Sequence, residues 1–154
     1  MENVTGSGAA ELEQEMAVLA RLLEALNRRR IYPLERSHYL LLLQLAEGPR
    51  KVSALSHILA LDATTVTRQV SAMEERGLVT RQADPDDRRS ALVARTAEGA
   101  ALAEAMRDAR TRRIARLVSG WEESDVTRFA AYLGQFNEAL YDRLGRPDEP
   151  PKSD

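Results

Sequence analysis

The sequence contains no cysteine and only two histidines, His38 and His57. The absence of cysteine excludes disulfides, thiolate metal sites, cysteine nucleophiles and thiol-based redox sensing by this chain. Two histidines are too few for a histidine metal cluster, and we expect neither a metal nor another cofactor. The sequence also lacks a glycine-rich phosphate loop and a histidine with a catalytic partner at a recognisable spacing, so we expect that the protein is not an enzyme.

Long apolar runs are missing as well. None approaches the roughly 20 residues of a membrane span, and the N-terminus lacks the basic-then-apolar order of a signal peptide. We therefore expect a cytoplasmic protein without membrane attachment. The 154 residues are 44% hydrophobic and 30% charged. That composition predicts a folded, helix-rich chain with one domain and helical extensions.

The net charge of −2 conceals an uneven distribution. Residues 50–95 contain eight basic and six acidic residues, whereas residues 1–49 and residues 96–154 are both net acidic. A local basic surface on an acidic protein is sufficient for contacts with nucleic acid phosphates. The excess is small, so the pattern of residues within this segment has to decide its function.

Residues 51–99 show the order of patterns expected for a helix-turn-helix followed by a β-hairpin. We predict a short helix capped by Ser53, a turn at Ala60–Leu61, and a second helix that Asp62 caps and Gly77 ends. Side chains at i, i+4 and i+7 of the second helix are apolar and should face inward; they are Val66, Val70 and Met73. Two strand-like runs then flank the turn-forming sequence ADPDDRRS.

The opposite face of the second helix is small and polar and has one arginine. It consists of Ala63, Thr64, Thr65, Thr67, Arg68 and Ser71. A helix that enters the major groove needs this character, because small residues allow close approach and hydroxyls, methyls and a guanidinium can meet base edges. An ordinary solvated helix face can look the same, but the preceding short helix and tight turn favour DNA binding.

The tip of the predicted hairpin carries Arg88 and Arg89, which are suited to a narrow minor groove. Three nearby aspartates oppose DNA binding by charge. A carboxylate can, however, hold a guanidinium in one orientation and leave its other donors aimed outward. The alternative, a solvated charged hairpin, remains open at this point.

Two helices are predicted before this segment. The first runs from Glu11 to Tyr32–Pro33, after a flexible stretch at residues 1–10. Its apolar residues alternate in spacings of four and three, which suits packing within the chain and a seam with a partner chain equally well. The second helix follows a cap at Ser37 and carries the run Leu40–Leu43, which should be buried on all sides.

Two more helices are predicted after it. Thr96 should cap a long helix from about residue 97 to 118, whose arginines either meet DNA or pair with acidic helices; they are Arg107, Arg110, Arg112, Arg113 and Arg116. The last helix spans about residues 122–144 and has one apolar face. Residues 145–154 should be a disordered tail.

These patterns resemble the MarR family of bacterial winged helix-turn-helix transcription regulators. The resemblance covers about residues 11–144 and is sharpest from Leu55 to Gly99. The runs LSHIL, LD, TVTR and MEERGLV resemble the family's helix-turn-helix, DPDDRR resembles its wing, and Thr96–Gly99 resembles the wing-to-helix junction. Two departures concern structure: Ala60 stands where glycine is common, and Arg95 stands where an apolar residue is usual.

The resemblance implies a mainly α fold with a small β-hairpin. Residues 35–96 would form the winged helix-turn-helix domain, and residues 11–32 and 97–144 would form a helical dimerisation region. Arg89 would enter the minor groove with Asp87 as its orienting partner, and Ser53 and Ser56 would lie near phosphates. The homodimer seam would use Leu12, Met16, Leu19, Leu23, Phe129, Leu133, Phe136 and Leu140.

The implied function is a homodimeric transcription regulator, a repressor that binds a pseudo-palindromic site in double-stranded DNA. Release by a small aromatic or anionic molecule is also implied, with Arg30, Tyr32, His38 and Tyr39 near the expected crevice. In the competing interpretation Tyr39 is a core residue and Arg30 a helix-end cation. A different function, that of a protein-interaction module that has lost DNA binding, also remains open.

Overall fold

The computed structural model describes residues 6–29 and 31–144. The chain divides after Arg36 into two compact units. Helix α1 (Ser7–Arg28) belongs to the first unit. It begins at Ser7 rather than at Glu11, because Gly6 is extended, Ser7 Oγ donates to the Glu11 carboxylate, and alanine favours the helix in between. Residues 7–10 of the stretch predicted to be flexible are therefore helical, residues 1–5 lie outside the described residues, and α1 ends before the predicted Tyr32–Pro33 stop.

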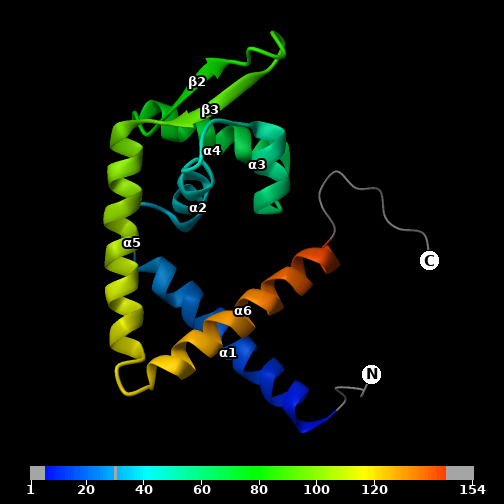
Figure 1. Ribbon diagram of the computed structural model, residues 1–154, viewed down its shortest axis with the longest axis vertical. Helices are drawn as coiled ribbons and strands as arrows, with labels where there is room; N and C mark the ends of the chain where they lie inside the picture. Colours follow the sequence, from blue (N-terminus) through cyan, green and yellow to red (C-terminus); the bar gives the residue numbers. More distant parts are fainter. Residues whose placement is uncertain (1–5, 30, 145–154) are drawn as a thin grey trace, which may run out of the picture. The chain divides into compact units, whose positions relative to one another are not determined.

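The second unit contains the helix-turn-helix, the hairpin and two long helices (Figure 1). Helix α2 begins at the boundary between the units. The elements are α2 (Arg36–Gln44), β1 (Arg50–Lys51), α3 (Val52–Leu59), α4 (Ala63–Glu75), β2 (Val79–Ala83), β3 (Ala91–Arg95), α5 (Ala97–Leu117) and α6 (Glu123–Leu144). The predicted fold class, mainly α with a small antiparallel hairpin, is confirmed. The predicted tail at residues 145–154 lies outside the described residues.

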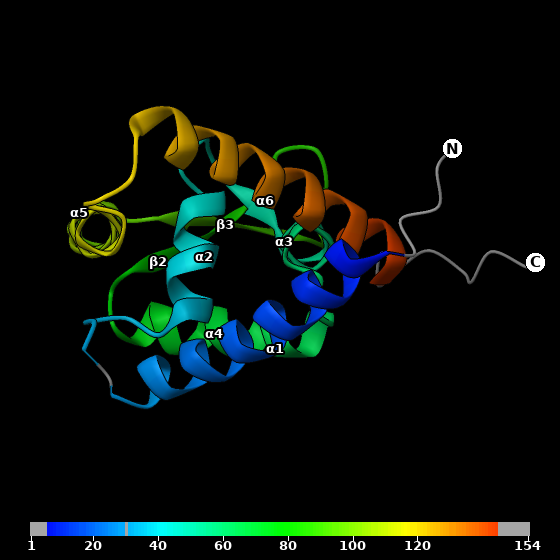
Figure 2. The same cartoon turned by 90° about the horizontal axis from the view of Figure 1, so that it is seen from below.

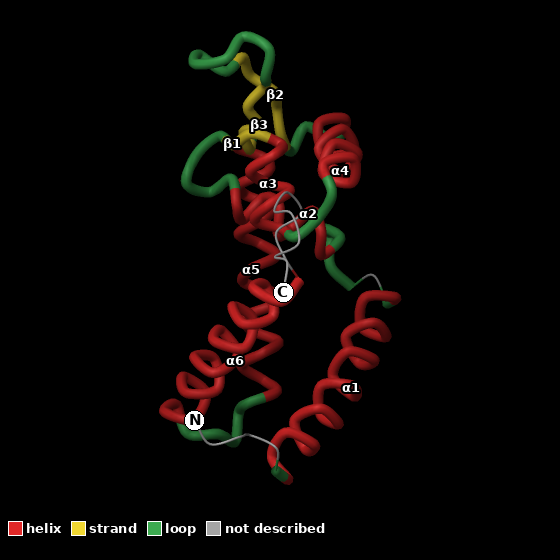
Figure 3. The backbone as a smooth tube through the Cα atoms, turned by 90° about the vertical axis from the view of Figure 1, so that its right-hand side faces the viewer, coloured by secondary structure: helices red, strands yellow, loops and turns green. Residues whose placement is uncertain are grey.

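The sheet has three antiparallel strands in the order β1-β3-β2 (Figure 3). Strands β2 and β3 form the predicted hairpin, with Val79 opposite Arg95 and Ala83 opposite Ala91. Strand β1, which the sequence did not predict, pairs Lys51 with Leu92 on the other side of β3. Two charged residues are too short a run to show strand alternation. The sheet therefore joins the start of α3 to the hairpin.

Helices α2, α3, α4 and α5 and the sheet enclose one apolar core. Its fully buried side chains include Leu41, Leu42, Leu45, Leu55, Val66, Val70, Met73, Val93 and Met106. The predicted all-round burial of the Leu40–Leu43 run is wrong, because Leu40 is 41% exposed on the outer side of α2. Ser37 also lies inside the first turn of α2 rather than at its cap.

Helix α5, seen nearly end-on in Figure 2, begins at the predicted residue, and α6 follows after a turn near Gly120. No residue of α6 is buried, and neither is any residue of α1. Within residues 6–29 and 31–144, no helix combines the length and apolarity that a membrane crossing requires.

Candidate nucleic-acid interface

The turn between α3 and α4 is closed by backbone and side-chain hydrogen bonds. Ala60 ends α3 in the left-handed conformation, with φ 53° and ψ 43°. The N–H of Leu61 donates to Ser56 O at 3.0 Å, and Ser56 Oγ donates to Leu61 O at 2.5 Å. Ser56 is therefore a buried residue that fixes the turn, and its predicted place near a phosphate is wrong.

Ser53 was predicted to cap α3, but Lys51 occupies the cap position and makes no side-chain capping bond. The strand pairing of Arg50 and Lys51 brings the helix start forward, so Ser53 lies in the first turn. Its side chain is exposed there. The proposed phosphate contact of Ser53 stays a prediction.

Asp62 caps α4 as predicted. Its carboxylate accepts from Thr65 N at 2.8 Å and from Thr65 Oγ1 at 2.6 Å. These two hydrogen bonds lower the pKa of Asp62, since they favour the ionised carboxylate. The Thr65 hydroxyl proton is used by the cap, so Thr65 can offer a base only its oxygen lone pairs and its methyl group.

The remaining outward residues of α4 have the predicted orientation. Val66, Val70 and Met73 are fully buried against the core. Ala63, Thr64, Thr67 and Arg68 are exposed along the opposite face. The structure thus offers a small polar surface with one guanidinium, on a helix whose position is fixed from beneath.

Ser71 joins α4 to the β2–β3 hairpin, which is the wing, because its hydroxyl binds a residue of β2. Arg81 on β2 donates through Nη2 to Ser71 Oγ at 3.1 Å, and its Nη1 forms an ion pair with the Glu74 carboxylate. These contacts link α4 to β2. They were missed from the sequence, because Gly77 ends the helix between the partners and only the packing of β2 beside α4 brings them together.

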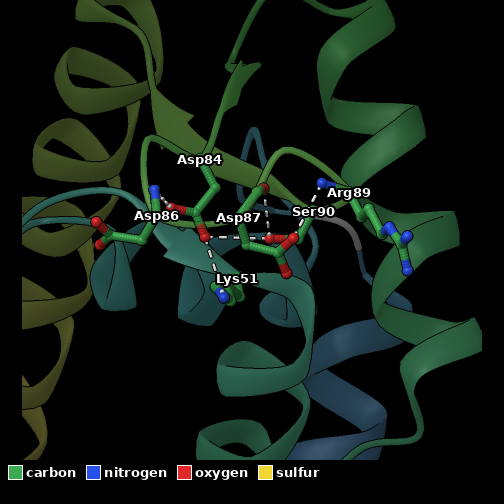
Figure 4. Close-up of polar contacts among 6 residues, drawn as sticks. All are labelled: Lys51, Asp84, Asp86, Asp87, Arg89 and Ser90. Carbon is green, nitrogen blue, oxygen red and sulfur yellow. Dashed lines mark hydrogen bonds and ion pairs between the residues drawn. The ribbon is translucent and has the colours of Figure 1, made fainter.

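The wing tip is organised around Asp84 (Figure 4). Its carboxylate accepts from Asp86 N at 2.9 Å and Ser90 Oγ at 3.1 Å, and it lies 3.0 Å from Lys51 Nζ. The Asp86 N–H and the Lys51 ammonium are the main causes that lower the pKa of Asp84, and Asp84 in turn raises the pKa of Lys51. The Asp84–Pro85 turn signal could have indicated the bond to Asp86. No pattern near Asp84 in the sequence could have indicated its ion pair with Lys51.

Arg88 and Arg89 are both exposed at the tip. Asp87 does not hold the Arg89 guanidinium; its Oδ1 accepts instead from Arg89 N at 3.0 Å. Figure 4 shows the Arg89 side chain leading away from the Asp87 carboxylate. The contact between Asp87 and Arg89 is therefore to the backbone, because a carboxylate two residues earlier is well placed to close an Asx turn. The predicted orienting role of Asp87 stays a prediction.

The wing root is tied to α5 by Thr96. Its Oγ1 accepts from Gly99 N at 3.0 Å, as predicted for a cap, and donates to Gly77 O at 2.6 Å. Thr96 N donates to Leu78 O at 3.1 Å. Gly77 has φ 70°, which explains why α4 stops at this residue. One threonine thus joins the end of α4, the start of β2 and the start of α5.

The other predicted sites lie elsewhere in the chain. Arg30 lies outside the described residues, while Tyr32 and His38 are half-buried. Tyr39 is a core residue, 7% exposed, and the Arg110 guanidinium lies 5.3 Å from its ring centroid. In α5, Arg107, Arg112 and Arg116 form no ion pair with any residue that the structure describes.

Comparison with known proteins gives a consistent result. A model described as MarR family matches residues 32–90. The chain is 34% identical over 134 residues to the HTH-type transcriptional regulator YxaD of Bacillus subtilis (strain 168). The aligned region covers 85% of this chain and 94% of YxaD. A MarR family protein from Bacillus stearothermophilus superposes with a TM-score of 0.72 at 25% identity, covering 86% of this chain and 95% of that one. The PcaV transcriptional regulator from Streptomyces coelicolor, solved with its natural ligand, shares the fold with a TM-score of 0.67 at 20% identity, over 91% and 99% of the chains.

Proposed function

Since this chain belongs to the MarR family of DNA-binding transcription regulators, which are not enzymes, we propose that it is a homodimeric repressor of a pseudo-palindromic operator. Each protomer would place α4 in the major groove and the wing in the adjacent minor groove. Two-fold symmetry would set the two α4 helices about one helical turn of DNA apart.

The observation that carries the proposal is the shared exposure of Arg68, Arg88 and Arg89. Figures 1 and 3 show α4 and the hairpin at the same end of the second unit. Of the acidic residues near these arginines, Asp62 binds Thr65 and Asp84 binds Lys51, while Asp86 and Asp87 are exposed at the tip. The surface therefore presents cations to DNA, although the whole chain is slightly acidic.

The dimer is supported by apolar side chains that remain exposed in one protomer. On α1, Leu12, Leu19 and Leu23 are between 37% and 51% exposed, while Met16 is half-buried. On α6, Phe129, Leu133 and Leu140 are between 43% and 52% exposed, while Phe136 is half-buried. Rows of exposed apolar side chains on a protein in water are usually covered by a partner. A second copy of the chain would present the same two apolar faces and could cover them.

We further propose that a small aromatic or anionic molecule weakens DNA binding. The support is the fold shared with PcaV, whose structure contains its natural ligand. The residues proposed for the contact are Arg30, Tyr32 and His38, while the burial of Tyr39 favours the core role for that residue. Release of labelled promoter DNA by salicylate-type carboxylates would support this part, and unchanged binding across such a series would refute it.

Titration of the protein's own promoter DNA at fixed salt tests the main proposal. Arg89→Ala should weaken binding by about 1–3 kcal/mol, the value of one good groove contact. Arg128→Ala is the matched control, because it removes the same charge from an exposed residue of α6 whose partner is Asp125. Equal affinities of wild type and Arg89→Ala would remove Arg89 from the interface. A flat dependence of affinity on salt, or a monomer at micromolar concentration in sedimentation, would contradict the dimeric DNA-binding function.

A further inference from the structure

We propose that Lys51 and Asp84 act as a positioning pair that fixes the wing tip for DNA, rather than as surface charges. The inference deepens the proposed function and depends on it, since it concerns the same DNA-binding surface. It assigns a role to two residues that are not proposed to enter the grooves and do not belong to α4.

The first observation is how completely the Asp84 carboxylate is satisfied. Its side chain is 4% exposed, whereas that of Lys51 is 43% exposed. Three donors reach it: the N–H of Asp86, the hydroxyl of Ser90 and the ammonium of Lys51. The N–H of Asp84 also donates to Ser90 O at 3.3 Å, which closes the hairpin beyond the last strand pair. A buried carboxylate with this many donors is part of the structure of the tip.

The second observation is where Lys51 comes from. Lys51 pairs with Leu92 of β3, and Leu92 pairs on its other side with Gln82 of β2. Asp84 lies two residues beyond Gln82, so the Lys51 side chain reaches across the end of β3 to meet it. The pair thus fastens the tip to the strand that leads into α3. The wing is held to the helix-turn-helix near its tip as well as in the middle of β2, where Arg81 contacts α4.

The third observation connects the pair to Arg89. Ser90 Oγ donates to Asp84 Oδ2 at 3.1 Å and lies 3.4 Å from Asp87 O. The carbonyl of Asp87 also accepts from Ser90 N at 3.0 Å, and its carboxylate accepts from Arg89 N. Figure 4 shows this continuous set of contacts. Loss of the Lys51 bond would loosen Asp84 and Ser90, and with them the backbone that aims Arg89.

Charge effects and positioning effects predict opposite signs for Asp84. DNA is a polyanion, so removing an aspartate near it should tighten binding if only charge matters. If the pair positions the wing, Asp84→Asn should weaken binding to the operator. Asp86→Asn is the matched control, because it removes the same charge two residues away, while only the backbone N–H of Asp86 takes part in the contacts.

The experiment is a titration of promoter DNA with Asp84→Asn, Lys51→Met, the double variant and Asp86→Asn. We expect each of the first two to weaken binding about 5-fold, the lower end of the 5- to 150-fold range for losing a whole groove contact. The double variant should be no weaker than the worse single variant, because both remove one interaction. Asp86→Asn should bind as tightly as wild type or tighter. Circular dichroism and thermal unfolding check that each variant is folded.

A second measurement uses the DNA-free protein. Amide hydrogen exchange at Asp86, Arg89 and Ser90 should accelerate in Asp84→Asn and in Lys51→Met, whereas Lys51→Arg should restore protection together with DNA affinity. Tighter binding by Asp84→Asn, or opposite and additive effects of the two single variants, would overturn the positioning role while leaving the proposed function intact. Absence of operator binding by the wild-type protein would instead overturn the proposed function, and the inference with it.

Discussion

Gly99 packs tightly against Leu78 at the wing root, and replacing it with alanine should destabilise the protein. A Cβ at this position would lie 2.0 Å from Leu78 O, 3.0 Å from Leu78 C and 3.2 Å from Leu42 Cδ2. The first two atoms belong to the backbone and cannot rotate away. Leu78 O also accepts the N–H of Thr96 at 3.1 Å, so a shift that relieves the clash would stretch this hydrogen bond.

The magnitude follows from three contributions. Overpacking at a tightly packed contact costs about 1–3 kcal/mol. Loss of the hydrogen bond to Leu78 O costs about 1 kcal/mol. The better helix propensity of alanine offsets about 1 kcal/mol. We therefore expect Gly99→Ala to reduce the free energy of unfolding by about 2 kcal/mol, which for a chain of this size lowers the Tm by roughly 4–8 °C.

The assay is urea unfolding at one fixed protomer concentration, because unfolding of a dimer depends on concentration. Gly134→Ala in α6 is the matched control, since nothing lies within 4 Å of a Cβ at that position. At that position only the better helix propensity of alanine acts, and we expect the free energy of unfolding to increase by about 0.5–1 kcal/mol. If Gly99→Ala were as stable as wild type, or as stable as Gly134→Ala, the close approach of α5 to Leu78 would be refuted.

Three further outcomes are expected. Ala60→Gly should raise the free energy of unfolding by up to about 1 kcal/mol, because relief of the left-handed strain at φ 53° exceeds the added entropy of the unfolded chain; lower stability in urea would contradict this. Thr96→Ala should lower the free energy of unfolding by about 1–2 kcal/mol, because it removes the α5 cap and the hydrogen bond to Gly77 O, whereas Thr96→Ser keeps the hydroxyl and should keep most of this stability. Equal thermal unfolding of the two variants would argue against the cap. The lowered pKa values of Asp62 and Asp84 mean that each carboxylate stabilises the fold above its usual pKa of 3.8, and that this stability is lost as pH falls below that value. Urea unfolding monitored by circular dichroism should therefore show Asp84→Asn less stable than wild type at neutral pH, with the difference shrinking as pH falls below 3.8; a difference that does not change with pH would exclude the Asp84 carboxylate as its cause.

Several features of the site were predictable because they depend on neighbours within about one helical turn. The Asp62 cap binds a residue three positions away, and the Thr96 cap does the same. The inward face of α4 follows from its helical period. The stop at Gly77 follows from its freedom to adopt a positive φ.

Other features could not be predicted from the sequence, because local patterns do not show which hydroxyl groups already form hydrogen bonds within the protein. Ser56 looks like a surface serine in a helical pattern, yet its side chain closes the turn to Leu61. Ser71 looks like a base reader, yet it binds Arg81. In each case the partner lies on another element, and the packing of α3, α4 and β2 decides the contact.

The sequence by itself therefore determined the helix-turn-helix and hairpin, the caps at Asp62 and Thr96, the stop at Gly77, the inward face of α4 and the family to which the chain belongs. Only the tertiary structure decided which polar groups remain for DNA, that a two-residue strand β1 exists, and that Lys51 meets Asp84 from 33 positions away. The physical reason is the distance along the sequence over which each kind of interaction acts. Capping and periodicity act between residues that are close in sequence, whereas the Lys51–Asp84 contact requires β1 and β2 to flank the same strand in one register.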